Sequence, residues 1–445
     1  MTRLTELLRG TPYVSYSYAY PHKTAYRQLR GPVPLRELWA AERRDALFLY
    51  LHIPFCEMRC GFCNLFTTAN PKGNLPAAYL ATLRREAQRT AEAIGPARFA
   101  RLAIGGGTPT YLSAGQLHAL FDIAETSLGA DPHAIPVSVE TSPQTATPDR
   151  LRALYKRGAD RISIGVQSFV AAETAAVGRA LRPADVDRAL DAIRACGFPT
   201  LNIDLIYGIP GQTARSWLGS LRAALRHAPE EIYLYPLYVR PLTGLGRHGA
   251  VVADDAAWDA QRLACYRAGR ELLLREGYTQ TSMRMFRAPH APAQDGPVYC
   301  CQEDGMVGLG CGARSYTRGL HYSSEYAVSR TGVRAILADY IGRRDESFDA
   351  AHYGIALSPE DQRRRFLIQS ILQADGLHLE AYRRRFGTDA LDDVPDLLDL
   401  EQCGLATITG DQLRLTNAGL ERSDTVGPWL YTASVRTLME AYELR

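Results

Sequence analysis

Three cysteines stand close together in the stretch LHIPFCEMRCGFCNLF, residues 51–66. Cys56, Cys60 and Cys63 form a C-x3-C-x2-C run just after an apolar segment at 46–53. Three thiolates on a loop that leaves a strand can each bind one iron of a [4Fe-4S] cluster, which leaves the fourth iron open to a small chelating ligand. The alternatives are a zinc site, with only His52 nearby as a fourth ligand, or buried thiols without a metal.

A second group of candidate residues is polar and follows later in the chain. The run at 105–107 is GGG, before Thr108, and glycines let backbone amides approach a bound anion, although a tight strand-to-helix turn also needs glycine. Each of the remaining polar candidates is costly to bury without a partner, and each could instead be a salt-bridge partner at a rim. They are Glu140, Gln167, Arg179 and Asp204.

The elements that must position these residues alternate between strand-like and helix-like segments. Apolar strand-like segments occur at 46–54, 99–104, 135–140, 160–166, 200–206 and 231–238. Helix-like segments between them occur at 75–94, 113–128, 148–157, 183–196 and 214–228. Such alternation predicts an α/β fold whose parallel strands are joined by right-handed crossovers, as an open sheet or a β/α barrel. Chemistry in such barrels gathers at the carboxyl ends of the strands, where most of the candidates fall.

Several motifs occur together in the order and spacing of a known family. They are HIPFC-x3-C-x2-C, GGGTPT, the Glu in SVETSP, IGVQSF, an Arg twelve residues beyond that Gln, and NIDLIYGIPGQT, within residues 47–315. This pattern resembles the HemN-like branch of the radical S-adenosylmethionine (SAM) enzymes. That branch includes anaerobic coproporphyrinogen III oxidases, HemW heme chaperones, and methylating or cyclopropane-forming enzymes. The resemblance implies a radical SAM partial (β/α)6-type barrel.

The resemblance also implies roles for individual residues. Cys56, Cys60 and Cys63 match the cluster ligands, and the cluster would receive electrons from a flavodoxin or ferredoxin. One or two SAM molecules would bind beside it, and Tyr238 falls at a position that contacts SAM through its backbone. The other positions that match SAM contacts are Tyr50, Phe62, Gly106, Gly107, Thr108, Glu140, Gln167, Arg179 and Asp204.

Departures from the family pattern bear on the reaction. The oxidases have a further Cys two residues after the third ligand, where this chain has Leu65. The chaperones have an HN-x2-YW signature where residues 297–302 read PVYCCQ, although the later turn at 308–310 is kept. The first choice is therefore methyl or methylene transfer to a flat conjugated small molecule with two SAM molecules. Porphyrinogen decarboxylation and heme trafficking are the alternatives.

Three further cysteines fall outside these motifs. Cys300 and Cys301 are adjacent, and Cys311 follows the turn at 308–310. They could donate a proton or hydrogen atom or bind a second metal, but free cysteines are often ordinary buried residues. Without a compact ligand spacing, the last interpretation is favoured.

The chain divides into three predicted parts. Residues 1–45 form an irregular arm rich in Tyr, which either covers an active site or packs against the core. The barrel with its extension spans 46–345. Residues 355–445 form a helical, winged-helix-like domain that would cover the substrate mouth, with helices at 359–373, 379–386 and 395–403, a hairpin ATITGDQLRLT, and a helix from Asn417.

Composition excludes several kinds of partner. A net charge of +3 is too small to predict nucleic acid or an anionic membrane, and the acidic run LDDVPDLLDLEQ offsets the arginines at 363–365 and 383–385. No run of about 18 apolar residues predicts a membrane span. Nine cysteines, three of them in one ligand run, favour a reducing cytoplasm over a disulfide framework.

Overall fold

The computed structural model describes residues 2–17, 19–247, 256–293 and 299–444. Tyr18 of the arm, and Pro297 and Val298 of the PVYCCQ stretch, lie outside the described residues. Among the described residues, no helix is both long and apolar enough to cross a lipid bilayer.

Six neighbouring parallel strands form the centre of the structure. In spatial order they are β2 (Leu47–Ile53), β5 (Phe99–Gly106), β6 (Val137–Thr141), β7 (Arg161–Gln167), β8 (Thr200–Tyr207) and β9 (Glu231–Pro236). All six correspond to predicted strand-like segments. The predicted α/β barrel-type fold is therefore confirmed.

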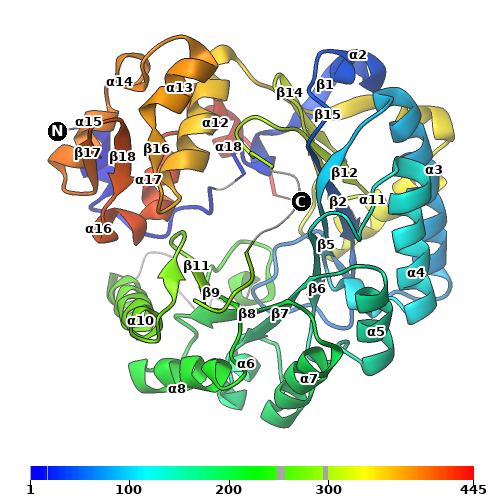
Figure 1. Cartoon of the computed structure of the whole chain (residues 1–445), viewed down its shortest axis with the longest axis horizontal. Coiled ribbons are helices and arrows are strands. Elements are labelled where there is room, and N and C mark those ends of the chain that lie inside the picture. The colour runs from blue at the N-terminus through cyan, green and yellow to red at the C-terminus, as the bar shows by residue number, and fades with distance from the viewer. Residues whose placement is uncertain (1, 18, 248–255, 294–298, 445) are drawn as a thin grey trace.

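Helices between these strands cover the outer side of the curved sheet (Figure 1). They are α3 (Leu75–Ile94), α4 (Ala114–Asp122), α5 (Pro148–Lys156), α6 (Ala171–Ala176), α7 (Pro183–Cys196) and α8 (Ala214–Leu225). Local signals set their ends: Ser113 and Gln116 form a capping box at α4, and Gly197 ends α7 at a φ of 79°. The first turns of α3, α5 and α7 contain proline, whose missing N–H costs nothing there.

The sheet continues beyond the parallel strands at both ends, to 13 strands in all. On one side β12 (Met306–Leu309) runs parallel to β2, followed by the antiparallel strands β13 (Arg314–Tyr316), β14 (Leu320–Ser323), β15 (Ala350–Ala356) and β1 (Arg27–Pro34). On the other side β11 (Met285–Arg287) and β10 (Thr279–Gln280) follow β9. The whole sheet forms an arc, as Figure 1 shows.

The prediction of an irregular arm is partly wrong. The arm contains α1 (Arg3–Leu7), a 3-10 turn at Lys23–Ala25, β1 and α2 (Leu35–Ala40). The strand gave no alternating pattern because β1 is an edge strand, most of its side chains are exposed, and its register shifts between Gln28 and Val33. An edge strand also tolerates the Gly31-Pro32 pair, which would break a central strand.

The C-terminal residues fill the opening between the two ends of the arc (Figure 1). The predicted helices and hairpin are present, with Gly410 at a φ of 58° in the hairpin turn. The elements are α12 (Pro359–Ile371), β16 (Leu377–His378), α13 (Leu379–Phe386), α14 (Ala390–Asp393), α15 (Leu397–Gln402), β17 (Ala406–Thr409), β18 (Gln412–Leu415), α16 (Asn417–Leu420), α17 (Ser423–Trp429) and α18 (Ala433–Glu440).

Two main hydrophobic cores hold the described residues together. The larger lies between the central strands and their covering helices, and the second lies within the C-terminal part. The arm contributes Tyr13 to the first core and Leu4, Tyr20 and Tyr26 to the second. It therefore packs against both parts, while the division of the chain near residues 45 and 345–355 stays a prediction.

Candidate functional site

The cysteine loop begins where β2 ends and is fixed by the glycine turn after β5. The amides of Gly107 and Thr108 donate to the carbonyls of Ile53 and Phe55 at 2.8 and 2.7 Å. A Cβ on Gly107 would lie 2.5 Å from the Phe55 oxygen and 2.9 Å from Cys56 Sγ, so no side chain fits there. The Thr108 hydroxyl donates to Cys56 Sγ at 3.6 Å. The GGGT turn therefore packs directly against the first cysteine.

The guanidinium of Arg179 packs against the second cysteine. It donates to Cys60 Sγ at 3.1 Å and to the Gly165 carbonyl at 2.8 Å, and its Nε is buried without a partner. Cys56 and Cys60 are almost fully buried, and Cys63 is half-buried. Burial raises the pKa of Cys56 to about 12 and also raises that of Cys60, so metal binding there would release protons.

The zinc alternative gains no support from the geometry. His52 is buried and its two ring nitrogens lie 3.0 Å from the Phe66 carbonyl and 3.1 Å from the Tyr50 hydroxyl. Within the described ranges, no three Cys, His, Asp or Glu side chains converge on a position for a single metal ion. Thiolates that each bind a different iron of a cluster do not need to converge on one point.

A cavity of about 250 Å³ lies inside the arc of strands. It brings together three of the predicted residues, Tyr50, Glu140 and Asp204, with Gly105 of the GGGT turn. Inward-facing side chains of neighbouring strands complete it, and the sequence analysis missed them. They are Ser138, Arg161, Ser163, Asn202, Tyr233 and Tyr235, with Tyr16 from the arm.

A simple signal could have found most of the missed residues. Side chains two positions apart on a strand face the same side of the sheet. Ser138 precedes Glu140 by two positions on β6, and Asn202 precedes Asp204 by two on β8. Once Glu140 and Asp204 are taken to face inward, this two-residue spacing predicts which of their neighbours on the same strand also face inward.

The two carboxylates of the cavity differ in exposure: Glu140 is open to solvent inside the cavity, and Asp204 is half-buried. Glu140 accepts a hydrogen bond from the Gly106 amide at 3.0 Å, and desolvation by the surrounding protein raises its pKa to about 7. Asp204 accepts from the Asn202 amide at 2.8 Å, and desolvation raises its pKa to about 6. Because neither carboxylate has an ion-pair partner in the described part of the chain, both can accept hydrogen bonds from a ligand.

The remaining predicted residues lie beside the cavity rather than in its lining. Gln167 ends β7 at a φ of 69°, and its side-chain nitrogen lies 2.8 Å from the position of a Cβ on Gly165. Phe62 packs against a small apolar cluster that contains Val177. The hydroxyl of Tyr238 is directed toward the C-terminal part, where it hydrogen-bonds Asp424.

Basic groups that the sequence analysis missed lie near the third cysteine. Lys23 Nζ lies 3.8 Å from the ring centre of Tyr326, and its strongest electrostatic neighbours are Arg314, Cys63 and Arg240. Burial, followed by the charge of Arg314, lowers the pKa of Lys23 to about 7. Within the described ranges, no carboxylate is among the groups that act most strongly on the charge of Lys23 or of Arg314. Lys23 belongs to the arm and is far in sequence from Tyr326 and Cys63, so no local sequence pattern marks it as part of the site.

The three additional cysteines do not form one group. Cys300 and Cys301 both donate to the side-chain oxygen of Gln302, at 3.2 and 3.3 Å. Cys311 is fully buried, beside Tyr79 and Glu86. The side chains of the first two converge, whereas Cys311 has surroundings of its own.

Comparisons with known proteins identify the family of the chain. The sequence model of the radical SAM superfamily matches residues 50–224, and that of the HemN C-terminal domain matches residues 357–421. An oxygen-independent coproporphyrinogen III oxidase of Paracoccus denitrificans is 30% identical over 393 residues, which are 85% of this chain and 83% of that protein. The chain belongs to the HemN-like radical SAM family.

Other members of this family are similar over different lengths. The heme chaperone HemW of Escherichia coli is 32% identical over 60% of this chain and 69% of its own length. The crystal structure of the coproporphyrinogen III oxidase HemN from Escherichia coli shares the fold, with a TM-score of 0.78 and 22% identity over 96% of this chain and 98% of that one.

As a HemN-like radical SAM protein, the chain has a [4Fe-4S] cluster and SAM as its cofactors. The residues present fit both groups. The glycine turn that leaves no room for a Cβ lies against a cysteine sulfur, and Arg179 has an unpartnered nitrogen beside the cysteine loop. The cavity supplies two carboxylates that suit a ligand rich in hydroxyl groups.

Proposed function

We propose that Cys56, Cys60 and Cys63 hold the cluster and that SAM binds in the adjoining cavity. In this proposal Glu140 and Asp204 accept hydrogen bonds from the ribose hydroxyls, and Arg179 pairs with the methionine carboxylate. The position of both carboxylates in the cavity lining and the contact of Arg179 with Cys60 support these roles. The further SAM contacts proposed are Tyr50, Phe62, Gly106, Gly107, Thr108, Gln167 and Tyr238.

When bound, the cluster and SAM would supply a 5′-deoxyadenosyl radical on delivery of one electron, an oxidant for removing a hydrogen atom from the substrate. The chain's own residues orient the ribose and exclude water from the cavity, which is walled by Tyr16, Tyr233 and Tyr235. A flavodoxin or ferredoxin is the proposed electron donor. A reducing cytoplasm is the compartment in which these thiols and such donors occur together.

The substrate we propose is a small molecule with carboxylate groups. The observation that carries this step is the position of Lys23, whose Nζ donates to the carbonyl of Asn64, next to Cys63, at 3.5 Å. The charge of Arg314 acts on Lys23, and neither group forms an ion pair with a carboxylate among the described residues. An anionic substituent on the substrate would supply the missing counter-charge. Oxidation of a porphyrinogen-like carboxylate compound is therefore the leading specific reaction.

In that reaction the substrate loses a hydrogen atom, then carbon dioxide and one electron, which leaves a carbon–carbon double bond. An external one-electron acceptor must take the electron. The oxidases of Paracoccus denitrificans and Pseudomonas aeruginosa, 30% and 28% identical over 85% and 93% of this chain, support this choice. Methyl or methylene transfer, the first choice on sequence, has no support from the relatives described above.

Heme trafficking remains a second candidate because the HemW chaperone of Escherichia coli is 32% identical over 271 residues. Its proposed site would lie at residues 299–302, where the chaperone signature is replaced by YCCQ. Retention of heme by the purified protein would favour this candidate over the oxidase.

The function is tested by anaerobic reconstitution with iron and sulfide, reduction with dithionite, removal of excess dithionite, and incubation with SAM, coproporphyrinogen III and an added one-electron acceptor. We expect 5′-deoxyadenosine, loss of carbon dioxide from the porphyrinogen, and no S-adenosylhomocysteine. Cys60→Ala should abolish all products, whereas Cys196→Ala, a half-buried thiol at the end of α7, should not. SAM cleavage without porphyrinogen turnover would retain the radical chemistry and exclude this substrate. An intact cluster without any cleavage of SAM would refute the proposed enzymatic activity.

A further inference from the structure

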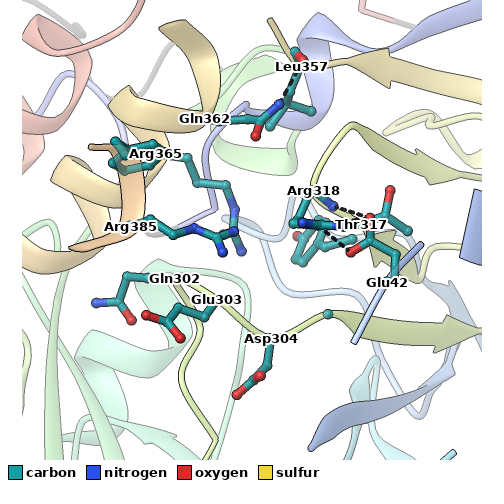
Figure 2. Close-up of a pocket in the computed structure, with 13 residues that line it drawn as sticks. Glu42, Gln302, Glu303, Asp304, Thr317, Arg318, Leu357, Gln362, Arg365 and Arg385 are labelled. Carbon is teal, nitrogen blue, oxygen red and sulfur yellow. Dashed lines mark hydrogen bonds and ion pairs between the residues drawn. The ribbon is translucent and has the colours of Figure 1, made fainter. Parts of the chain in front are cut away.

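A second cavity lies outside the proposed active site, between the C-terminal helices and the edge of the sheet. It has a volume of about 20 Å³, and α12 and α13 form one wall, with Arg365 and Arg385 on them. The loop before β12 forms another wall with Gln302 and Glu303, and Arg318 follows β13. Figure 2 shows the side chains of Arg365 and Arg385 pointing into this cavity.

Both arginines end a run of three, and the other members of these runs have carboxylate partners or reach solvent. On α12, Arg363 pairs with Asp393 at 2.9 Å and Arg364 pairs with Glu360 at 3.5 Å. On α13, Arg383 pairs with Glu380, Asp389 and Asp411, and Arg384 is exposed. The basic runs that resemble a nucleic-acid signal are therefore mostly compensated within the C-terminal part.

Arg365 and Arg385 differ from their neighbours. Both are half-buried, and neither forms an ion pair or a hydrogen bond with another described residue. The Nε of Arg365 is fully shielded from solvent and has no partner. Two guanidinium groups directed into one cavity repel each other, and a shielded donor without a partner is costly. An anion between them would remove both penalties.

The carboxylates in the same lining already have partners. Glu42 pairs with Arg318 at 3.4 Å, and Glu303 pairs with Arg43 at 3.6 Å. Asp304 accepts a hydrogen bond from the amide of Cys300 at 2.9 Å. The acidic groups therefore leave the two C-terminal guanidinium groups uncompensated.

We propose that this cavity binds a small oxyanion, a phosphate or carboxylate group, between Arg365 and Arg385. The planar guanidinium forks match the paired oxygens of such a group, and the volume admits a single group rather than a whole cofactor. The site is separate from the proposed SAM cavity, with which it shares no lining residue. Tyr316, whose ring lies 5.8 Å from the Arg365 guanidinium, belongs to the lining of the oxyanion cavity.

Such an anion would connect two parts of the chain. Arg365 and Arg385 belong to the C-terminal helices, whereas Gln302 lies on the loop that leads into β12. The Gln302 side-chain amide already donates to the Ser370 hydroxyl of α12 at 3.3 Å. A bound oxyanion would therefore strengthen the contact between α12 and the extension of the sheet.

The test is calorimetric titration of the reconstituted holoprotein with inorganic phosphate and, separately, with citrate, against sodium chloride at equal ionic strength. We expect saturable one-site binding that Arg365→Gln and Arg385→Gln each weaken by about tenfold or more, because each removes a charged hydrogen-bond donor. Tighter binding of phosphate would assign a phosphate group, and tighter binding of citrate a carboxylate; either outcome retains the oxyanion site.

Two further variants make the result independent of folding defects. Arg384→Gln removes an exposed neighbouring charge and should leave the affinity unchanged. Glu303→Gln removes a negative charge from the lining and should tighten binding, which a damaged protein would not do. Absence of saturable binding by the unaltered protein, or equal affinity in all four variants, would overturn the proposal.

Discussion

A fully buried ion pair joins the C-terminal part of the chain to the barrel, and its removal gives the sharpest prediction. Arg284, in the turn between β10 and β11, donates to both oxygens of Asp424 at 2.6 Å. Both side chains are completely shielded from solvent, and Arg284 also donates to the Tyr238 hydroxyl at 2.6 Å. Asp424 is therefore the counter-charge that the described part of the chain provides for this guanidinium.

Asp424→Asn keeps the size of the side chain and removes its charge. The variant leaves the Arg284 guanidinium buried without a compensating carboxylate, so we expect a loss of about 3–5 kcal/mol in the free energy of unfolding. Arg284 also lies 4.3 Å from the ring centre of Tyr16, which lines the proposed SAM cavity. SAM affinity should therefore fall together with stability.

The assay is chemical denaturation of the holoprotein, followed by a double-mutant cycle with Arg284→Met. The double variant should recover part of the loss, because it no longer buries an unpaired charge. Glu360→Gln is the control, since it breaks the exposed pair with Arg364 on α12 and should cost about 0.5 kcal/mol or less. A cost for Asp424→Asn no greater than that of the control would refute the reasoning.

Three other predictions concern the proposed active site. Gly107→Ala should lower the iron content after reconstitution, because its Cβ would lie 2.9 Å from Cys56 Sγ, whereas Gly115→Ala, with no atom within 4 Å, should not. In the SAM-free protein, desolvation by the surrounding residues raises the pKa of Glu140 to about 7 and that of Asp204 to about 6, so stability should fall as pH rises toward these values. Denaturation between about pH 4 and 8 should show a flatter slope for Glu140→Gln, and an unchanged slope would contradict the assignment. Lys23→Gln should raise the KM for a carboxylate substrate with little change in SAM-dependent 5′-deoxyadenosine formation, and an unchanged KM would argue against an anionic substrate near Lys23.

The parallel strands and their helices were predictable because local signals mark them. The apolar segments that became β2, β5, β7 and β8 are buried along most of their length, so composition distinguishes them from the helices between. In β6 and β9, alternate side chains face the cavity and are less buried. The helices at 75–94 and 183–196 begin at proline-containing turns and end before glycine, and their bounds match the predictions. Tyr50, Glu140 and Asp204 were predicted as site residues from the family pattern and lie together in one cavity.

What could not be predicted depends on contacts between distant segments. Asp424 follows Arg284 by 140 residues, and α17 around it is short and buried throughout, so no amphipathic pattern marks it. Tyr16 and Lys23 come from an arm whose only strand lies at an exposed edge. Arg365 and Arg385 look like their neighbours in sequence and differ because no carboxylate of the described residues pairs with them. In each case the role of a charge or ring depends on which groups from another part of the fold lie near it, and no local pattern of residues records that.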